Sequence, residues 1–223
     1  MVVLATKCYV AGDARQRAVD SLSSQVENLL GELDVTYDVG IRDDDFPSVT
    51  VEGADRTIAQ NLLREEFGQI TPHRDPGEVH VGTLERWDDD GFYLDAGQEV
   101  HIPASELELG PGSPEQIRTR FGLVQHLPLR FVPREDGPAR LADEERDRLY
   151  EWTRGNGRVN VNSATRAEVR ATVNRAGHAQ DIVTVERLGL LEQSIVCTED
   201  TDPPGLLSNI GSYLSAELLA VVP

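Results

Sequence analysis

The sequence predicts an α+β protein built from three consecutive parts. Short alternating apolar runs, two of them joined by an Asp-Gly turn, occupy the middle third and indicate a small barrel of strands. On both sides, strand-like and helix-like runs alternate, with proline, glycine and capping residues between them. We therefore expect an α+β domain over residues 1–72, a barrel over 78–142, and a connecting helix with a second α+β domain over 143–223.

The first part has the order βαββα. The expected elements are a strand from Val2 to Val10, a helix capped by Asp13, strands over 34–41 and 48–52, and a helix capped by Asp55. Apolar residues recur at spacings of three and four in both helices: Ala18, Leu22, Val26, Leu29, Leu30 and Leu33 in the first, and Ile58, Leu62, Leu63 and Phe67 in the second. A linker rich in proline and glycine, 71–77, separates this part from the barrel.

The middle part contains five strand-like runs, with one helix between the third and the fourth. This is the order of a small OB-type barrel. Ser113, Pro114 and Gln116 supply the cap, the first-turn proline and the third-position glutamine of that helix. Alternation places Phe92 towards the core and Tyr93 on the opposite side of the strand. The charged helix over 144–152 is expected to pack on the barrel.

The last part has the order βαββαβ, which is the ferredoxin-like split βαβ arrangement. Thr165 and Glu168 have the spacing of a capping box, and Gly177 lies just beyond the expected end of that helix. The expected elements are strands over 158–161, 181–188, 191–197 and 217–222, and helices over 166–176 and 205–214.

Two stretches of the middle part resemble a known domain. Gly82-Thr-Leu-Glu-Arg-Trp87 with Asp88-Asp-Asp-Gly-Phe-Tyr-Leu-Asp95, and then Ile102-Pro-Ala-Ser-Glu-Leu107, resemble the S-one type RNA-binding domain, named after the ribosomal protein that repeats it. The whole chain also resembles an uncharacterised archaeal protein family, in a haloarchaeal form, with such a domain in its middle. The resemblance implies an OB fold with two base-stacking positions, of which Asp90 takes the first and Tyr93 the second.

The charge is strongly acidic, with a net value of −18, and Lys7 is the only lysine among 21 basic residues. An acidic, lysine-poor surface is typical of proteins that stay hydrated in molar salt, so we expect a halophilic, cytoplasmic protein. At about 1 M salt the screening length is roughly 3 Å, so acidity does not exclude a polyanionic partner but favours close contacts over long-range attraction. The chain has no apolar run long enough for a membrane helix and no signal-peptide features at its start.

Two sets of residues are candidates for binding nucleic acid. On the barrel, a stacking and hydrogen-bonding patch is expected from Trp87, Tyr93, His101, Arg130 and Arg140. The second set lies in the segment from Arg154 to Arg175, where Glu168 is the only acid, and comprises Arg158, Arg166, Arg170 and Arg175. The alternatives are that the barrel is a protein-binding or spacer module, and that these arginines pair with carboxylates of neighbouring domains.

Catalytic and metal-binding signatures are absent from the sequence. It has no Walker lysine, no Gly-x-Gly-x-x-Gly, no Gly-x-Ser-x-Gly and no zinc-ligand spacing, so neither a cofactor nor a metal is expected. We therefore expect a non-catalytic RNA-binding protein that acts on rRNA or tRNA in translation or RNA processing. The main alternative is a protein-binding adaptor in a transcription or ribosome-associated complex. An enzyme would need a deep pocket that brings together groups such as His178, Asp181 and Arg175.

Overall fold

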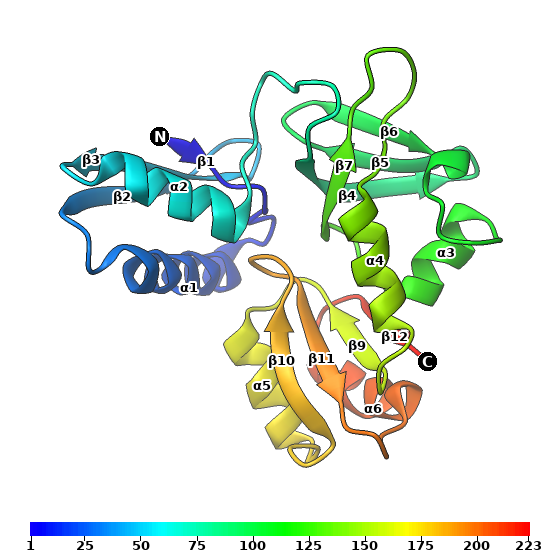
Figure 1. Cartoon of the computed structure of the whole chain (residues 1–223). Helices are drawn as coiled ribbons and strands as arrows, with labels where there is room; N and C mark the ends of the chain where they lie inside the picture. Colours follow the sequence, from blue (N-terminus) through cyan, green and yellow to red (C-terminus); the bar gives the residue numbers. More distant parts are fainter.

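In the computed structural model, which describes residues 1–223, the chain forms three antiparallel sheets of three, five and four strands, one in each third of the sequence. Figure 1 shows three lobes that follow one another along the chain and converge at the centre of the molecule. Each lobe has a cluster of buried apolar side chains. The expected mixed α+β architecture is confirmed.

The N-terminal domain has the expected order of elements. These are β1 (Val2–Val3), α1 (Gly12–Leu30), β2 (Val35–Ile41), β3 (Pro47–Gly53) and α2 (Arg56–Phe67). The middle strand of its sheet is β3, between β1 and β2. Leu22 and Val26 of α1, Leu63 of α2 and Val51 of β3 share one core, because the three-and-four spacing places the apolar side chains of each helix on one face.

Three details of this domain differ from the sequence prediction. The first strand is two residues long rather than extending from Val2 to Val10, because only Val2 and Val3 pair with β3 in a ladder, and Thr6, Lys7 and Tyr9 contact the other two domains. The first helix begins at Gly12 with Ala11 as its cap, so Asp13 lies in the first turn and caps nothing. Ile58 is 52% exposed, and Ala59 takes the buried position beside Leu63.

The central domain is a curled sheet with the strand order β6-β5-β4-β7-β8. Its elements are β4 (His80–Asp88), β5 (Gly91–Asp95), β6 (Glu99–Pro103), α3 (Pro114–Phe121), β7 (Pro128–Val132), β8 (Arg140–Leu141) and α4 (Asp143–Trp152). The edge strands β6 and β8 share no ladder, so the sheet curls without closing into a complete barrel. The capping box of Ser113 and Gln116 is present, and Leu149 and Trp152 of α4 pack into the same core as Phe92, as expected.

The C-terminal domain also follows the expected order. It comprises β9 (Arg158–Val161), α5 (Arg166–Arg175), β10 (Ile182–Arg187), β11 (Gln193–Cys197), α6 (Pro203–Ile210) and β12 (Leu218–Val221). The strand order in its sheet is β10-β11-β9-β12. Thr165 and Glu168 form both bonds of the predicted capping box. The last helix begins at Pro203, with Asp202 as its cap, and ends at Ile210, because a 3-10 turn takes Gly211–Tyr213.

A short segment, Thr6–Tyr9, joins the three domains, and we call its contacts the junction. The hydroxyl oxygen of Thr6 accepts a hydrogen bond of 2.7 Å from the backbone N–H of Leu190 in the C-terminal domain. Lys7, the only lysine, is 8% exposed and pairs with two carboxylates of the central domain, Glu85 at 3.1 Å and Asp95 at 2.7 Å. A charged side chain is rarely this buried unless it is paired, and Lys7 has two partners.

Tyr9 completes the junction. Its hydroxyl donates to Oε1 of Glu192 at 2.7 Å and accepts from the backbone N–H of Ser163 at 2.8 Å. Its ring lies 3.8 Å from the ring of His126, between centroids. Glu192 is fully buried without a cation beside it, and burial raises its pKa to about 8. Burial also acts to raise the pKa of Glu85, but hydrogen bonds with His126 and Thr83 and the charge of Lys7 outweigh it and lower that pKa to about 2.

Candidate nucleic-acid interface

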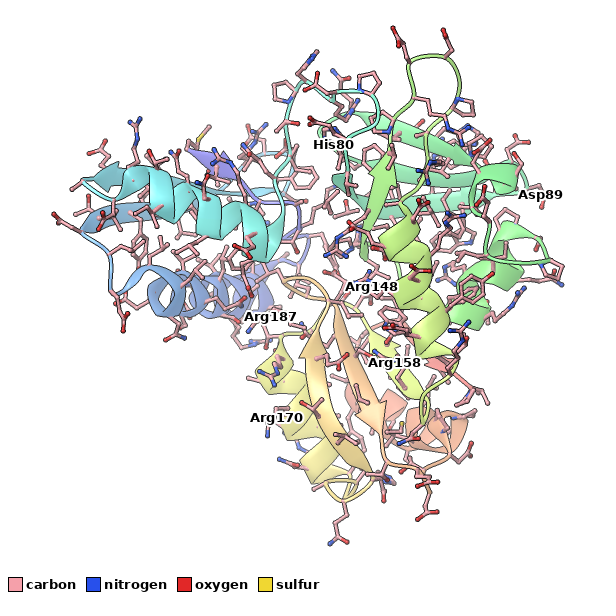
Figure 2. All side chains as sticks on the ribbon, in the orientation of Figure 1. His80, Asp89, Arg148, Arg158, Arg170 and Arg187 are labelled. Atoms are coloured by element: carbon pink, nitrogen blue, oxygen red, sulfur yellow. The ribbon has the colours of Figure 1, made fainter.

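Beside the junction runs a trench whose lining is rich in arginine. It consists of two adjoining hollows, which share Arg148, Arg187 and Leu188. The first, which we call the inner pocket, has a volume of about 200 Å³ and is lined by residues of all three domains. The second, the α4 hollow, measures about 560 Å³ and lies between α4 and β10. Figure 2 shows Arg148, Arg158 and Arg187 near the centre of the molecule, where the three lobes converge.

The trench is a positively charged region of an acidic protein. Each hollow is lined by four arginines and two glutamates, whereas the chain as a whole has a net charge of −18. The arginines of the inner pocket are Arg64, Arg130, Arg148 and Arg187, and those of the α4 hollow are Arg148, Arg158, Arg166 and Arg187. A concave surface that gathers one sign of charge raises the local concentration of the opposite ion. The trench is therefore a candidate site for anions.

A buried carboxylate fixes two of these arginines. Glu145 of α4 has no exposed surface, and its two oxygens bond Arg130 at 3.2 Å and Arg148 at 3.1 Å. Glu145 also accepts the backbone N–H of Arg130 at 3.3 Å. One carboxylate neutralises only one of the two guanidinium groups, and the only other carboxylate contact of the pair is a loose one of 3.6 Å between Arg130 and the exposed Glu144. The fixed orientation leaves other guanidinium N–H groups available to a ligand.

Arg148 and Arg158 are held close together despite their like charges. Their guanidinium carbons lie 5.1 and 4.8 Å from the centre of the Trp152 ring, which gives each a cation–π contact. Arg158 also pairs with Glu186 at 3.1 Å. Burial lowers the pKa of Arg158, and the charge of Arg148 adds to that lowering, whereas Glu186 opposes it. An anion bound in the α4 hollow, which both arginines line, would reduce this repulsion.

Arg166 and Arg187 form a similar pair. The Nε–H of Arg166 donates to the backbone oxygen of Val185 at 2.6 Å, and Arg166 has no carboxylate partner. Arg187 has only a loose contact of 3.6 Å with Glu66. Burial lowers the pKa of Arg187, and the positive charge of Arg166 lowers it further. The negative charge of Glu66 acts in the opposite direction and raises it. The two side chains are thus close enough to repel each other and are only weakly neutralised.

Of the five residues expected to form the patch on the barrel, Tyr93 and His101 contact each other, and the other three have separate surroundings. Tyr93 on β5 lies between cross-strand neighbours on β4 and β6, Arg86 and His101. The rings of Tyr93 and His101 stack at 4.5 Å, and the guanidinium carbon of Arg86 lies 3.4 Å from the centre of the Tyr93 ring. Because the two neighbours come from opposite sides of β5, the protein itself covers both faces of this ring.

The other barrel candidates have separate surroundings. Trp87 bonds Glu115 of α3 through its indole N–H, and the guanidinium carbon of Arg118 lies 3.7 Å from the centre of its ring. Trp87 therefore holds α3 against the sheet. Arg140 bonds Asp143 at the start of α4. Of the five barrel residues singled out from the sequence, only Arg130 lines the trench.

The four arginines predicted from the segment between Arg154 and Arg175 also fall into two groups, of which only one lines the trench. Arg158 and Arg166 line the α4 hollow, whereas Arg170 and Arg175 lie exposed on α5. Figure 2 shows Arg170 on α5, away from the centre of the molecule. Arg175 lies at a different groove, between the start of α1 and α5. Neither exposed arginine has a carboxylate within 4.0 Å, so the intramolecular pairing considered above is not formed at these two positions.

No other cluster has the arrangement of a cofactor or metal site. His178 bonds Asp181 at 2.6 Å and contacts Asn209 at 3.1 Å, but this group lines neither hollow of the trench. No three His, Cys, Asp or Glu side chains are placed to hold a metal ion together. No helix is both long enough and apolar enough to cross a membrane.

Sequence reasoning missed four residues of the trench: Arg64, Glu145, Arg148 and Arg187. One signal was available, because Glu145, Leu149 and Trp152 recur at spacings of four and three and so share a helix face. A glutamate on the buried face of a helix predicts a cationic partner. Nothing in the sequence indicates that Arg187, which follows in another domain, lies beside Arg148.

Comparison with known proteins identifies the chain by its domains. Its N-terminal domain matches the DUF2110 N-terminal domain over residues 1–73, the middle matches the DUF2110 central domain over 74–153, and the remainder matches the DUF2110 C-terminal domain over 156–222. A search of curated proteins gives no match. The central match includes α4, which supplies Glu145 and Arg148 to the trench. With all three domains present in order and almost every residue covered, the chain belongs to the DUF2110 family.

Proposed function

We propose that this protein is a non-catalytic RNA-binding protein that acts on rRNA or tRNA in translation or RNA processing, and that it binds RNA through the trench. The observation that carries the proposal is the excess of arginine over glutamate in both hollows of a strongly acidic chain. Arginine presents a planar fork of N–H donors that matches the oxygens of a phosphate. Contacts of this kind act at short range and persist where salt screens long-range attraction.

The fold is consistent with this role. In our proposal the curled central sheet is an S-one-like OB domain and the C-terminal domain is ferredoxin-like. Support for the latter is that β11 lies between β9 and β10, the strand insertion that defines a split βαβ unit. We also propose that the protein comes from a halophilic archaeon and works in molar salt. The acidic, lysine-poor composition supports that part.

The test compares two arginines one helical turn apart on α5. Arg166 lines the α4 hollow and Arg170 does not. We expect Arg166→Glu to weaken binding of an rRNA or tRNA fragment by about tenfold or more, and to flatten the salt dependence by about 0.7 in log–log slope for each phosphate that the variant no longer neutralises. Arg170→Glu makes the same change of charge outside the trench and should alter affinity by less than about threefold. The readout is fluorescence anisotropy over a series of salt concentrations.

Equal reductions of affinity in the two variants would show that overall charge, and not the trench, controls binding. If the wild-type protein binds no RNA but an acidic peptide binds in its place and no longer binds to Arg166→Glu, the protein is instead an adaptor for protein partners.

A further inference from the structure

The inner pocket is smaller than the sites that usually enclose a whole small ligand. Its volume is about 200 Å³, whereas such sites usually measure about 300–1,000 Å³. Thr6 and Arg64 contribute from the N-terminal domain, Arg130 and Arg148 from the central domain, and Arg187 from the C-terminal domain. The space fits one end of a larger molecule, with the rest of that molecule in the wider α4 hollow.

The charges along the trench indicate where an anionic strand would end. On one side the inner pocket continues into the α4 hollow through Arg148 and Arg187. On the other side it adjoins a hollow lined by Asp75 and Glu78, in which Arg64 is the only arginine. A polyanion that enters along the α4 hollow therefore meets attraction as far as the inner pocket and repulsion beyond it.

The four arginines of the inner pocket are weakly neutralised. Arg64 donates to the side-chain oxygens of Gln69 at 2.6 Å and Asn61 at 2.8 Å and has no carboxylate partner. Arg130 and Arg148 share the carboxylate of Glu145, and Arg130 and Arg187 each have one further loose contact of 3.6 Å, with Glu144 and Glu66. These few and partly loose contacts leave guanidinium N–H donors free, which suits a ligand group with several acceptor oxygens.

We propose that the inner pocket binds the terminal phosphomonoester of an RNA strand whose internal phosphates lie along the α4 hollow. A phosphomonoester carries about −1.5 to −2 charge at pH 7, whereas an internal phosphodiester carries a single negative charge. The surplus of arginine donors therefore favours the end of the strand over its interior. This assignment depends on the RNA binding proposed above and adds which part of the strand the protein recognises.

The experiment uses one single-stranded oligoribonucleotide in three forms: with a 5′-phosphate, with a 3′-phosphate, and with hydroxyl groups at both ends. We expect one phosphorylated form to bind the full-length protein at least tenfold more tightly than the hydroxyl form, in fluorescence anisotropy at pH 7. The preferred form identifies the direction of the strand. Arg64→Ala with Arg187→Ala should reduce this preference to less than twofold. Arg170→Ala with Arg175→Ala, two arginines outside the trench, should preserve it.

Melting temperatures of both double variants verify that they are folded. Equal affinity for all three RNA forms, or a preference that survives in the Arg64 and Arg187 variant, overturns the terminal-phosphate assignment and leaves RNA binding intact. Failure of every form to bind overturns RNA binding as well. A nucleoside monophosphate that binds as tightly as the phosphorylated RNA identifies a free nucleotide as the ligand and also overturns the assignment.

Discussion

The junction and the trench lie side by side, and each contains a glutamate with no exposed surface. Their surroundings are opposite. At the junction, Glu192 receives one hydrogen bond from Tyr9 and faces no cation. In the trench, Glu145 holds two guanidinium groups, those of Arg130 and Arg148. Burial stabilises Glu192 in its protonated form. The single negative charge of Glu145 faces two positive charges.

This difference separates a structural contact from a binding surface. Most groups of the junction satisfy one another: Lys7 has two carboxylates, the hydroxyl of Tyr9 both donates and accepts, and Oε2 of Glu192 alone has no partner. Such a cluster holds domains together and has little affinity left for a ligand. In each hollow of the trench the lining arginines outnumber the lining glutamates. An anionic ligand can therefore pair with the guanidinium groups that have no full partner in the protein.

The largest expected effect concerns Glu192 and pH. Burial raises its pKa to about 8, against a usual value of 4.5, so the folded state binds a proton that the unfolded state releases. The contribution to stability is present in full below about pH 4.5 and is lost as the pH rises through 8. We expect the free energy of unfolding to fall on the order of 4 kcal/mol between pH 5 and pH 9, measured by urea denaturation.

The control is Glu192→Gln, which keeps the shape of the side chain and removes its titration. Its stability should lack this decline and exceed that of the wild type at pH 9. The measurements stay above pH 5 because Glu85, with its pKa lowered to about 2, gives the opposite slope in acid. Parallel pH profiles for wild type and Glu192→Gln would show that Glu192 is ionised in the folded protein.

A smaller effect is expected at Glu145. Glu145→Gln leaves Arg148 without a carboxylate partner and Arg130 with only its loose contact to Glu144, and should lower the free energy of unfolding by about 1–3 kcal/mol. The loss is below that of a fully buried pair because Arg130 and Arg148 are 44% and 26% exposed. Inorganic phosphate should raise the melting temperature of this variant more than that of the wild type, because the trench then holds an additional uncompensated charge.

Asp143→Asn is the matched control, because Asp143 is an exposed carboxylate on the same helix that also contacts two arginines, Arg140 and Arg146. Its cost should stay within about 1 kcal/mol. An equal response of both variants to phosphate would mean that the anion does not bind beside Glu145.

The smallest effect is expected on the barrel. Tyr93→Ala should change RNA affinity by less than about twofold, because His101 and Arg86 already cover both faces of the Tyr93 ring. If a base displaced one of them and stacked on the ring, the same substitution would cost about 1–3 kcal/mol of binding free energy. Fluorescence anisotropy with the RNA fragments used for the trench variants distinguishes the two results.

Local signals in the sequence were sufficient for much of the fold. The capping boxes at Ser113 and Thr165 form as predicted because both partners lie within four residues of each other. The order of helices and strands in all three domains also follows from local periodicity. Val2 to Val10 was predicted wrongly as one strand because an apolar run has the same composition in a sheet and in a contact between domains. The residues that make this segment a contact between domains are its partners Leu190 and Glu192, which lie far along the chain.

The trench could be predicted only in part, for a related reason. Arg130, Arg158 and Arg166 attracted notice as basic residues in an acidic chain, but Arg170 and Arg175 share that property and lie elsewhere. Membership of the trench depends on how three domains dock. That docking is set by contacts such as the pair of Lys7 and Glu85, which no local pattern indicates.

The span of the junction has a consequence for how the chain is made. Tyr9 and Glu192 are separated by 183 positions, so one partner leaves the ribosome long before the other. At a synthesis rate of about 5–20 residues per second, the interval is roughly 10 to 40 s. The N-terminal and central domains can fold during that time, but Thr6–Tyr9 cannot complete its contacts until most of the C-terminal domain has been translated. Docking of the C-terminal domain therefore comes last, after Lys7 can already pair with Glu85 and Asp95, and the nascent chain has no complete trench until its synthesis is almost finished.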